Sequence, residues 1–169
     1  MQTDQDLRDR AMVFYRSHVE RIERILKEFA RLSGAKSALL VDKDGHMITR
    51  VGEVGTWDED TISALVAGSF AATKEMARLL GEEEFSALFH QGKRDNIQLS
   101  LVGDRTILTV IFDDSTTLGM VRLYVSEAVR KLLEVLEEAR ANDSHEDSAL
   151  NRDYTALAKE ELDRLFKGA

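Results

Sequence analysis

The residues that could do chemistry in this chain are few and scattered. Its four histidines lack the spacing of a metal site, and structural or surface positions are expected for them: His18, His46, His90 and His145. Three arginines stand at expected strand ends or turns, where an arginine could face a phosphate but usually just solvates a loop: Arg50, Arg94 and Arg105. The motifs GxxxxGK[ST], GxGxxG and GxSxG are absent. The sequence therefore predicts no catalytic residue, no cofactor and no metal, and a protein that is not itself an enzyme.

Composition narrows the class of partner. The 169 residues carry 23 basic and 31 acidic side chains, a net charge of −8, which disfavours nucleic acid and anionic membranes. No apolar run approaches the roughly 20 residues of a membrane span, and the polar stretch Met1 to Arg10 is unlike a signal peptide. There is no cysteine, hence no disulfide framework. We expect a cytoplasmic protein of one domain with an appendage.

One expected helix, from Asp58 to Leu80, lacks charge on a face that should be solvated. A period of about 3.6 residues assigns seven residues to the core side: Ile62, Leu65, Val66, Phe70, Thr73, Met76 and Leu80. The opposite side begins with small residues only: Ala64, Ala67, Gly68 and Ala71. Glycine inside a helix costs about 0.5 to 1 kcal/mol relative to alanine, so Gly68 favours close packing of another backbone over helix propensity alone. The pattern predicts a docking surface for a protein partner.

The other elements must hold this helix on a sheet. An amphipathic helix is expected from about Met12 to Leu32, ending at Ser33-Gly34, and another over Thr117 to Ala139. An Asp-Gly turn at Asp44-Gly45 predicts a hairpin. Five strands are expected in all: 37–42, 47–51, 85–91, 97–102 and 106–112. Runs of strands between helices indicate an α+β fold with a five-stranded antiparallel sheet.

The termini are expected to be separate from this domain. Residues 1–11 form a charged extension before a domain at 12–140. Residues 141–150 are polar and without periodicity, which predicts a flexible linker. Residues 151–169 carry an amphipathic stripe that predicts a short helix, and a helix of this length is marginal alone. We expect this helix to dock on the domain or on a partner.

The order of elements and several motifs resemble the roadblock/LC7 family. The resemblance lies in SALLVDKDGHMI from Ser37, ALVAGSFAATKEMARLLGEEEF from Ala64, FHQG from Phe89 and SLVGDRTILTVIFDDSTTLGMVRL from Ser100. MVFY at Met12 and the acidic tail KEELDRLF are similar to members that activate a Ras-like small GTPase of the MglA type in bacterial cell polarity and motility. The match covers nearly the whole chain.

The resemblance implies a homodimer in which two sheets join edge to edge and the two second helices lie side by side. Dimer contacts are then expected at Gly68, Ala72, Phe89 and His90. The GTPase would contact Ala64, Ala67, Ala71, Glu75 and Arg78, with the tail helix reinforcing it through Leu162, Leu165 and Phe166. His90 could pair across the interface, in which case His90→Ala would weaken dimerisation.

The resemblance also implies a mechanism. One GTPase would bind per dimer in its GTP form, and hydrolysis would be stimulated by shifting the GTPase's own residues rather than by an arginine finger. Concentration at a cell pole and contacts with other polarity proteins are further implications. The alternative is a roadblock scaffold that recruits a GTPase or other proteins without changing the rate of hydrolysis.

Overall fold

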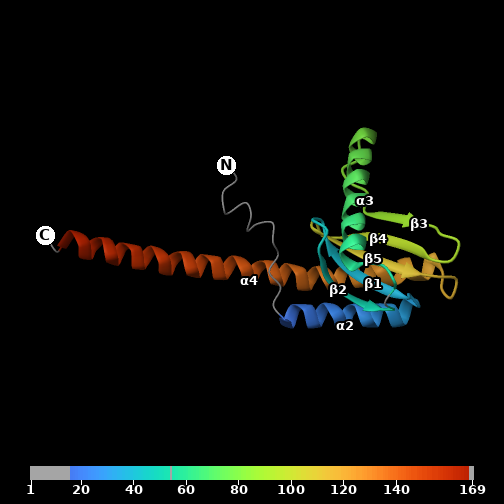
Figure 1. The fold of residues 1–169 in the computed structure, drawn as a ribbon, viewed down its shortest axis with the longest axis horizontal. Coiled ribbons are helices and arrows are strands. Elements are labelled where there is room, and N and C mark those ends of the chain that lie inside the picture. Colours follow the sequence, from blue (N-terminus) through green and yellow to red (C-terminus); the bar gives the residue numbers. More distant parts are fainter. Residues whose placement is uncertain (1–15, 54, 168–169) are drawn as a thin grey trace. The chain divides into compact units, whose positions relative to one another are not determined.

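The computed structural model describes residues 16–53 and 55–167, with side chains described up to residue 142. Its helices are α2 (Arg16–Ser33), α3 (Glu59–Leu80) and α4 (Leu118–Lys167). The strands are β1 (Ser37–Asp42), β2 (Met47–Gly52), β3 (Ala87–His90), β4 (Asn96–Val102) and β5 (Thr106–Phe112). They form one antiparallel sheet in the order β2-β1-β5-β4-β3 (Figure 1). The predicted α+β fold with five antiparallel strands is confirmed.

Helices cover both faces of this sheet. α2 packs against β1 and β2 on one face, with the first part of α4 beside it, and α3 packs against the other face (Figure 1). Lys131 of α4 pairs with Glu28 of α2 at 3.6 Å between nitrogen and oxygen. The chain divides into two units, one of residues 16–135 and one that includes α4 from Leu136 onwards. Among the described residues, none of the helices combines the length and the apolar content that a membrane span requires.

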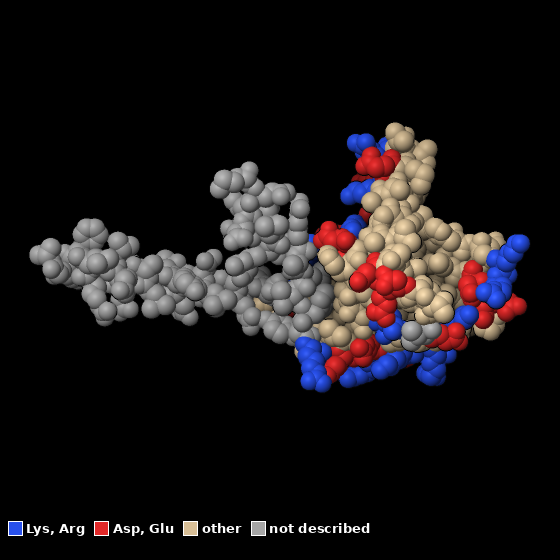
Figure 2. Space-filling view, viewed as in Figure 1, with Lys and Arg blue, Asp and Glu red and all other residues tan. Residues whose placement is uncertain are grey.

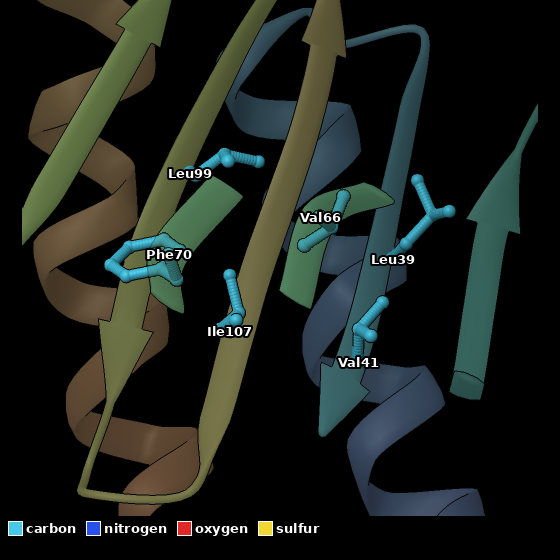
Figure 3. Close-up of a cluster of buried hydrophobic side chains, with 6 residues drawn as sticks. All are labelled: Leu39, Val41, Val66, Phe70, Leu99 and Ile107. Atoms are coloured by element: carbon cyan, nitrogen blue, oxygen red, sulfur yellow. The ribbon is translucent and has the colours of Figure 1, made fainter. Parts of the chain in front are cut away.

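The core between α3 and the sheet alternates along the strands. Leu39 and Val41 of β1 lie two residues apart, so both point to the α3 face, where Leu99 and Ile107 join them. α3 contributes Val66 and Phe70, one helical turn apart (Figure 3). This cluster fixes which face of α3 is buried, and therefore which residues it leaves outside.

Phe70→Ala is expected to destabilise the fold strongly. The ring is 5% exposed and contacts the centre of the α3 core cluster, so its removal leaves a cavity that the sheet cannot fill. We expect a loss of about 3 to 5 kcal/mol in the free energy of unfolding, measured by urea denaturation. Val66→Ala, a smaller deletion in the same cluster, is the matched comparison. A loss below about 1 kcal/mol for Phe70→Ala would show that α3 does not pack as described.

The ends of α3 are set by local chemistry, as the sequence predicts. The carboxylate of Asp58 accepts hydrogen bonds from the backbone N–H of Thr61 at 2.8 Å and from its hydroxyl at 2.7 Å. At the other end Gly81 adopts a φ of 77°, and its N–H bonds to the carbonyl of Arg78 at 3.2 Å. Residues other than glycine rarely adopt this left-handed conformation. Asp58 is therefore the N-cap of α3, and Gly81 ends the helix.

Two carboxylates make the stability of the fold depend on pH. Hydrogen bonds from the Thr61 hydroxyl and amide lower the pKa of Asp58, and hydrogen bonds from Ser115, with the nearby Lys36, lower the pKa of Asp113. Because both folded pKa values lie below the ordinary value of 3.8, this stabilisation is complete above that pH and is lost as the pH falls through the folded values. The urea concentration at the midpoint of unfolding should therefore fall below about pH 4, and should fall less in Asp58→Asn. An unchanged pH profile in that variant would contradict the assignment.

The structure differs from the prediction at the C-terminal side. α4 runs without interruption from Leu118 to Lys167, through residues 141–150, so the expected linker and separate terminal helix are wrong. Between Met120 and Lys167 the chain has neither proline nor glycine, and nothing in the local sequence ends the helix. Leu162, Leu165 and Phe166 lie on this helix, but their side chains lie outside those described.

The remaining differences are small. β3 spans Ala87–His90 rather than 85–91, and as the edge strand it pairs with β4 alone. The expected first helix begins at Arg16 in the described residues, and the predicted residues 12–15 lie outside them. β1 and β5 have the predicted bounds.

Candidate interaction site on helix α3

α3 buries a narrower face than the sequence predicts. Its buried residues are Ser63, Val66, Ala67, Phe70, Thr73 and Ala77. Small residues among them let the helix lie close to neighbouring parts of the fold. The hydroxyls of Ser63 and Thr73 are hydrogen-bonded within the helix itself. Ser63 donates to the carbonyl of Glu59 and Thr73 to that of Ser69, each at 2.8 Å. The predicted burial of Thr73 is confirmed, whereas Ser63, also polar and internally bonded, is buried at a position that the hydrophobic pattern did not assign to the core.

Ala67 and three apolar residues lie on the opposite side of the helix from the side predicted. Ala67 is 8% exposed and faces inward, so its expected place on the outward face is wrong. Leu65, Met76 and Leu80, expected in the core, are exposed by 63%, 53% and 73%. Leu79, which the sequence pattern did not single out, is 82% exposed. If Ser63 and Ala77 are taken as the buried positions, the helical period turns these apolar side chains toward solvent, as the structure has them.

The outer face of α3 carries two parallel stripes. The first, which we call the apolar stripe, has spacings of seven, four and three residues: Leu65, Ala72, Met76 and Leu79. The second, the small-residue stripe, repeats the same spacings one residue earlier: Ala64, Ala71, Glu75 and Arg78. All eight residues are exposed, and in the view of Figure 2 much of α3 shows no charged side chain. The spacing places each stripe along one line of the helix.

The backbone of α3 is accessible between the two stripes, and the turn between β1 and β2 lies against the N-terminal end of the small-residue stripe. A Cβ atom on Gly68 would meet nothing within 4 Å, so this glycine leaves open space. At the foot of the small-residue stripe the turn between β1 and β2 lies close, because a Cβ on Gly45 would come 3.2 Å from the Cα of Ala64. Near the other end Glu75 and Arg78 form an ion pair at 2.7 Å that is largely solvent-exposed and contributes little to stability. Apart from the turn beside Ala64, the outer face of α3 is therefore unpartnered among the described residues and suited to close approach.

The other expected contact lies at the edge of the sheet. β3 pairs with β4 through Phe89↔Gln98 and His90↔Ile97, and its other side is open among the described strands. The ring of Phe89 stacks on Phe112 with centroids 6.2 Å apart. Phe89 is therefore tied into its own sheet, while His90 is exposed.

Arg50 and Asp42 have partners within the fold. Arg50 is paired with Glu59 at the start of α3, and its side chain is only 26% exposed. Asp42 accepts hydrogen bonds from the backbone N–H groups of Asp44 and His46 at 3.0 and 2.8 Å. Its carboxylate therefore stabilises the hairpin turn. Among the residues that the structure describes, no three metal-ligating side chains come together.

Comparison with known proteins agrees with the geometry. The family model of the Roadblock/LC7 domain matches residues 21–112. Among solved structures, MglB of Myxococcus xanthus is 35% identical, with 75% of this chain and 96% of that chain covered and a TM-score of 0.71. Gliding protein MglB of Thermus thermophilus is 34% identical, with 76% and 97% covered and a TM-score of 0.70. An MglB with a tetrameric arrangement has the same identity and coverage and a TM-score of 0.73. This chain therefore belongs to the roadblock/LC7 family and is similar in sequence and fold to MglB proteins.

Proposed function

We propose that this chain is a homodimeric regulator of a Ras-like small GTPase of the MglA type. It binds the GTP form of the GTPase and stimulates hydrolysis. The likeness to MglB proteins at 34% to 35% identity over three quarters of the chain supports this class of function. The observation that carries the proposal is that the outer face of α3 exposes two stripes of residues along one continuous helix.

The apolar stripe is assigned to a second copy of the chain. Leu65, Met76 and Leu79 are each more than half exposed, and large apolar side chains gathered in this way mark an interaction surface. In a two-fold dimer the stripe would meet itself, with Gly68 and Ala72 at the closest approach of the two helices. The open edges of β3, with Phe89 and His90, would then continue one sheet into the other. A similar MglB is known in a tetrameric arrangement, which supports self-association in general.

The small-residue stripe is assigned to the GTPase. Ala64 and Ala71 let a partner backbone approach closely, and Glu75 and Arg78 offer both charges at one end of the stripe. Two such stripes, one from each copy, make a composite surface across the two-fold axis, so that one GTPase binds per dimer. The C-terminal part of α4, with Leu162, Leu165 and Phe166, reinforces this contact.

Hydrolysis is then accelerated by the GTPase's own residues. Binding shifts the loops of the GTPase until its resident groups meet the γ-phosphate, and no arginine of this chain enters the site. The pairing of Arg50 with Glu59 supports this mechanism, since it leaves that arginine engaged within its own chain. We place this activity in bacterial cell polarity or motility, at a cell pole, with other polarity proteins as further partners.

The rate of GTP hydrolysis separates this proposal from a passive scaffold. Single-turnover hydrolysis by an MglA-type GTPase is measured with increasing amounts of this chain. We expect a saturable acceleration that reaches its plateau at two chains per GTPase. Binding without any acceleration would leave the scaffold as the function, and absence of binding to either nucleotide form would contradict both.

A further inference from the structure

The edge of the sheet opposite β3 carries a groove that the proposed function does not use. β2 pairs with β1 alone, so its other side is open among the described strands. A hollow of about 530 Å³ follows this side and is lined by Met47–Gly52, by Glu23 and Lys27 of α2, and by Glu59 of α3. The groove therefore runs along all of β2, with a helix on each side.

Neighbouring residues of β2 anchor the two walls. Thr49 faces α2, where its hydroxyl donates to the carboxylate of Glu23 at 3.1 Å, and Arg50 faces α3, where it pairs with Glu59. On the α2 wall Lys27 and Glu23 form an ion pair at 3.8 Å, in which the side chain of Lys27 is 69% exposed and that of Glu23 is 39% exposed. On the α3 wall Glu59 is 48% exposed, against 26% for Arg50. Each wall thus carries an ion pair, whose more exposed member is basic on the α2 wall and acidic on the α3 wall.

From this geometry we infer that an extended segment of a partner protein binds along β2 as a sixth strand, with an acidic side chain toward Lys27 and a neighbouring basic side chain toward Glu59. An open strand edge offers a row of unpaired backbone N–H and C=O groups, and strand addition uses them for affinity. Consecutive side chains of a strand point to opposite faces of the sheet. An adjacent acidic and basic pair therefore reaches the exposed Lys27 on one wall and the exposed Glu59 on the other at once.

A second copy of this chain fits the groove poorly. α2 packs mainly against β2, so it lies along the edge of the sheet (Figure 1). In edge-to-edge pairing about a two-fold axis, the two β2 strands would lie about 4.8 Å apart. Each copy would bring its own α2 to the same face, although packed helix axes need about 8 to 10 Å. A single strand avoids this conflict.

The test uses the full chain and a defined peptide. The probe is a labelled octapeptide blocked at both ends, Gly-Val-Thr-Glu-Lys-Val-Thr-Gly, titrated into nitrogen-15-labelled protein. We expect amide shift changes concentrated in β2 and around Glu23 and Lys27. Two further peptides carry N-methyl groups at alternate positions, in opposite phase. One phase should abolish binding and the other should retain it, because a strand pairs through one edge only.

Variants of the walls separate strand addition from general charge attraction. Lys27→Glu and Glu59→Lys should each weaken the peptide roughly fivefold, as expected for an exposed ion pair replaced by a like-charge contact. Glu59→Gln should fall between the parent chain and Glu59→Lys. Lys93→Glu, in the loop between β3 and β4, is the matched control and should bind the peptide normally.

Five results would overturn the inference. Four of them are no shift at millimolar peptide, shifts confined to α3, equal binding of both methylated peptides, and unchanged affinity in both wall-reversal variants. A change in oligomeric mass caused by Lys27→Glu would assign the groove to a second copy instead, which also overturns it.

Discussion

Ala71→Arg is expected to abolish binding of the GTPase while the homodimer stays intact. Ala71 lies in the middle of the small-residue stripe and is exposed, so a long charged side chain there does not disturb the core of its own chain. It would instead hold the partner's backbone away from α3. Overpacking of a close contact costs about 1 to 3 kcal/mol, and the composite surface contains the substitution twice. We expect binding at least about 100-fold weaker by isothermal titration against the GTPase loaded with a GTP analogue.

Ala71→Ser is the matched control, because it adds one oxygen and keeps the stripe small. It should bind within about twofold of the parent chain, given the small effect of most surface substitutions. Light scattering coupled to gel filtration reports the mass of each variant. A monomeric Ala71→Arg chain would show that this flank of α3 meets the twin helix, and an unchanged affinity would remove the small-residue stripe from the GTPase contact.

Met76→Glu is expected to dissociate the homodimer. Met76 is 53% exposed in the single chain and lies in the apolar stripe. Full burial of such a side chain is worth about 1.5 to 3 kcal/mol, and a two-fold interface loses this contribution twice. The introduced carboxylates would also face each other across the two-fold axis. Sedimentation analysis should show a dissociation constant raised by at least about 100-fold, with an unchanged circular dichroism spectrum.

Lys74→Glu controls for charge in this prediction. Lys74 is exposed two residues away, outside both stripes, and its reversal changes the net charge by more than Met76→Glu does. It should leave the dimer intact. A stable Met76→Glu dimer would mean that the apolar stripe is not the interface, whereas dissociation by both variants would indicate a general effect of charge.

Local chemistry made most of the fold predictable. The N-cap Asp58, the left-handed Gly81 and the Asp-Gly turn each act within a few residues, and the sequence predicts the bounds of α3 and the position of the Asp-Gly turn correctly. Strand patterns were reliable for the central β1 and β5, which are buried on both faces. The edge strand β3 was predicted too long, because nothing in its sequence shows that only one neighbour pairs with it.

The candidate site was harder to predict because it depends on the exact rotation of α3. Hydrophobicity favoured Leu65 and Met76 for the core, whereas the structure buries Ser63 and Ala77. Small or internally bonded residues can approach a neighbour closely, and their hydropathy does not reveal this. The groove along β2 is a further case, since its walls come from α2 and α3, which are separated by the β hairpin in sequence.

The labelling rate of single thiols on α3 tests the division of its outer face most directly. The chain contains no cysteine, so Ala71→Cys and Ala72→Cys each introduce one thiol, on adjacent residues of different stripes. With a maleimide reagent, the thiol at position 72 should react slowly in the dimer whether or not GTPase is present. The thiol at position 71 should react rapidly alone and slowly once GTP-loaded GTPase is added at saturation. Rapid labelling at position 72 in the dimer, or an unchanged rate at position 71 with the GTPase bound, would contradict the account.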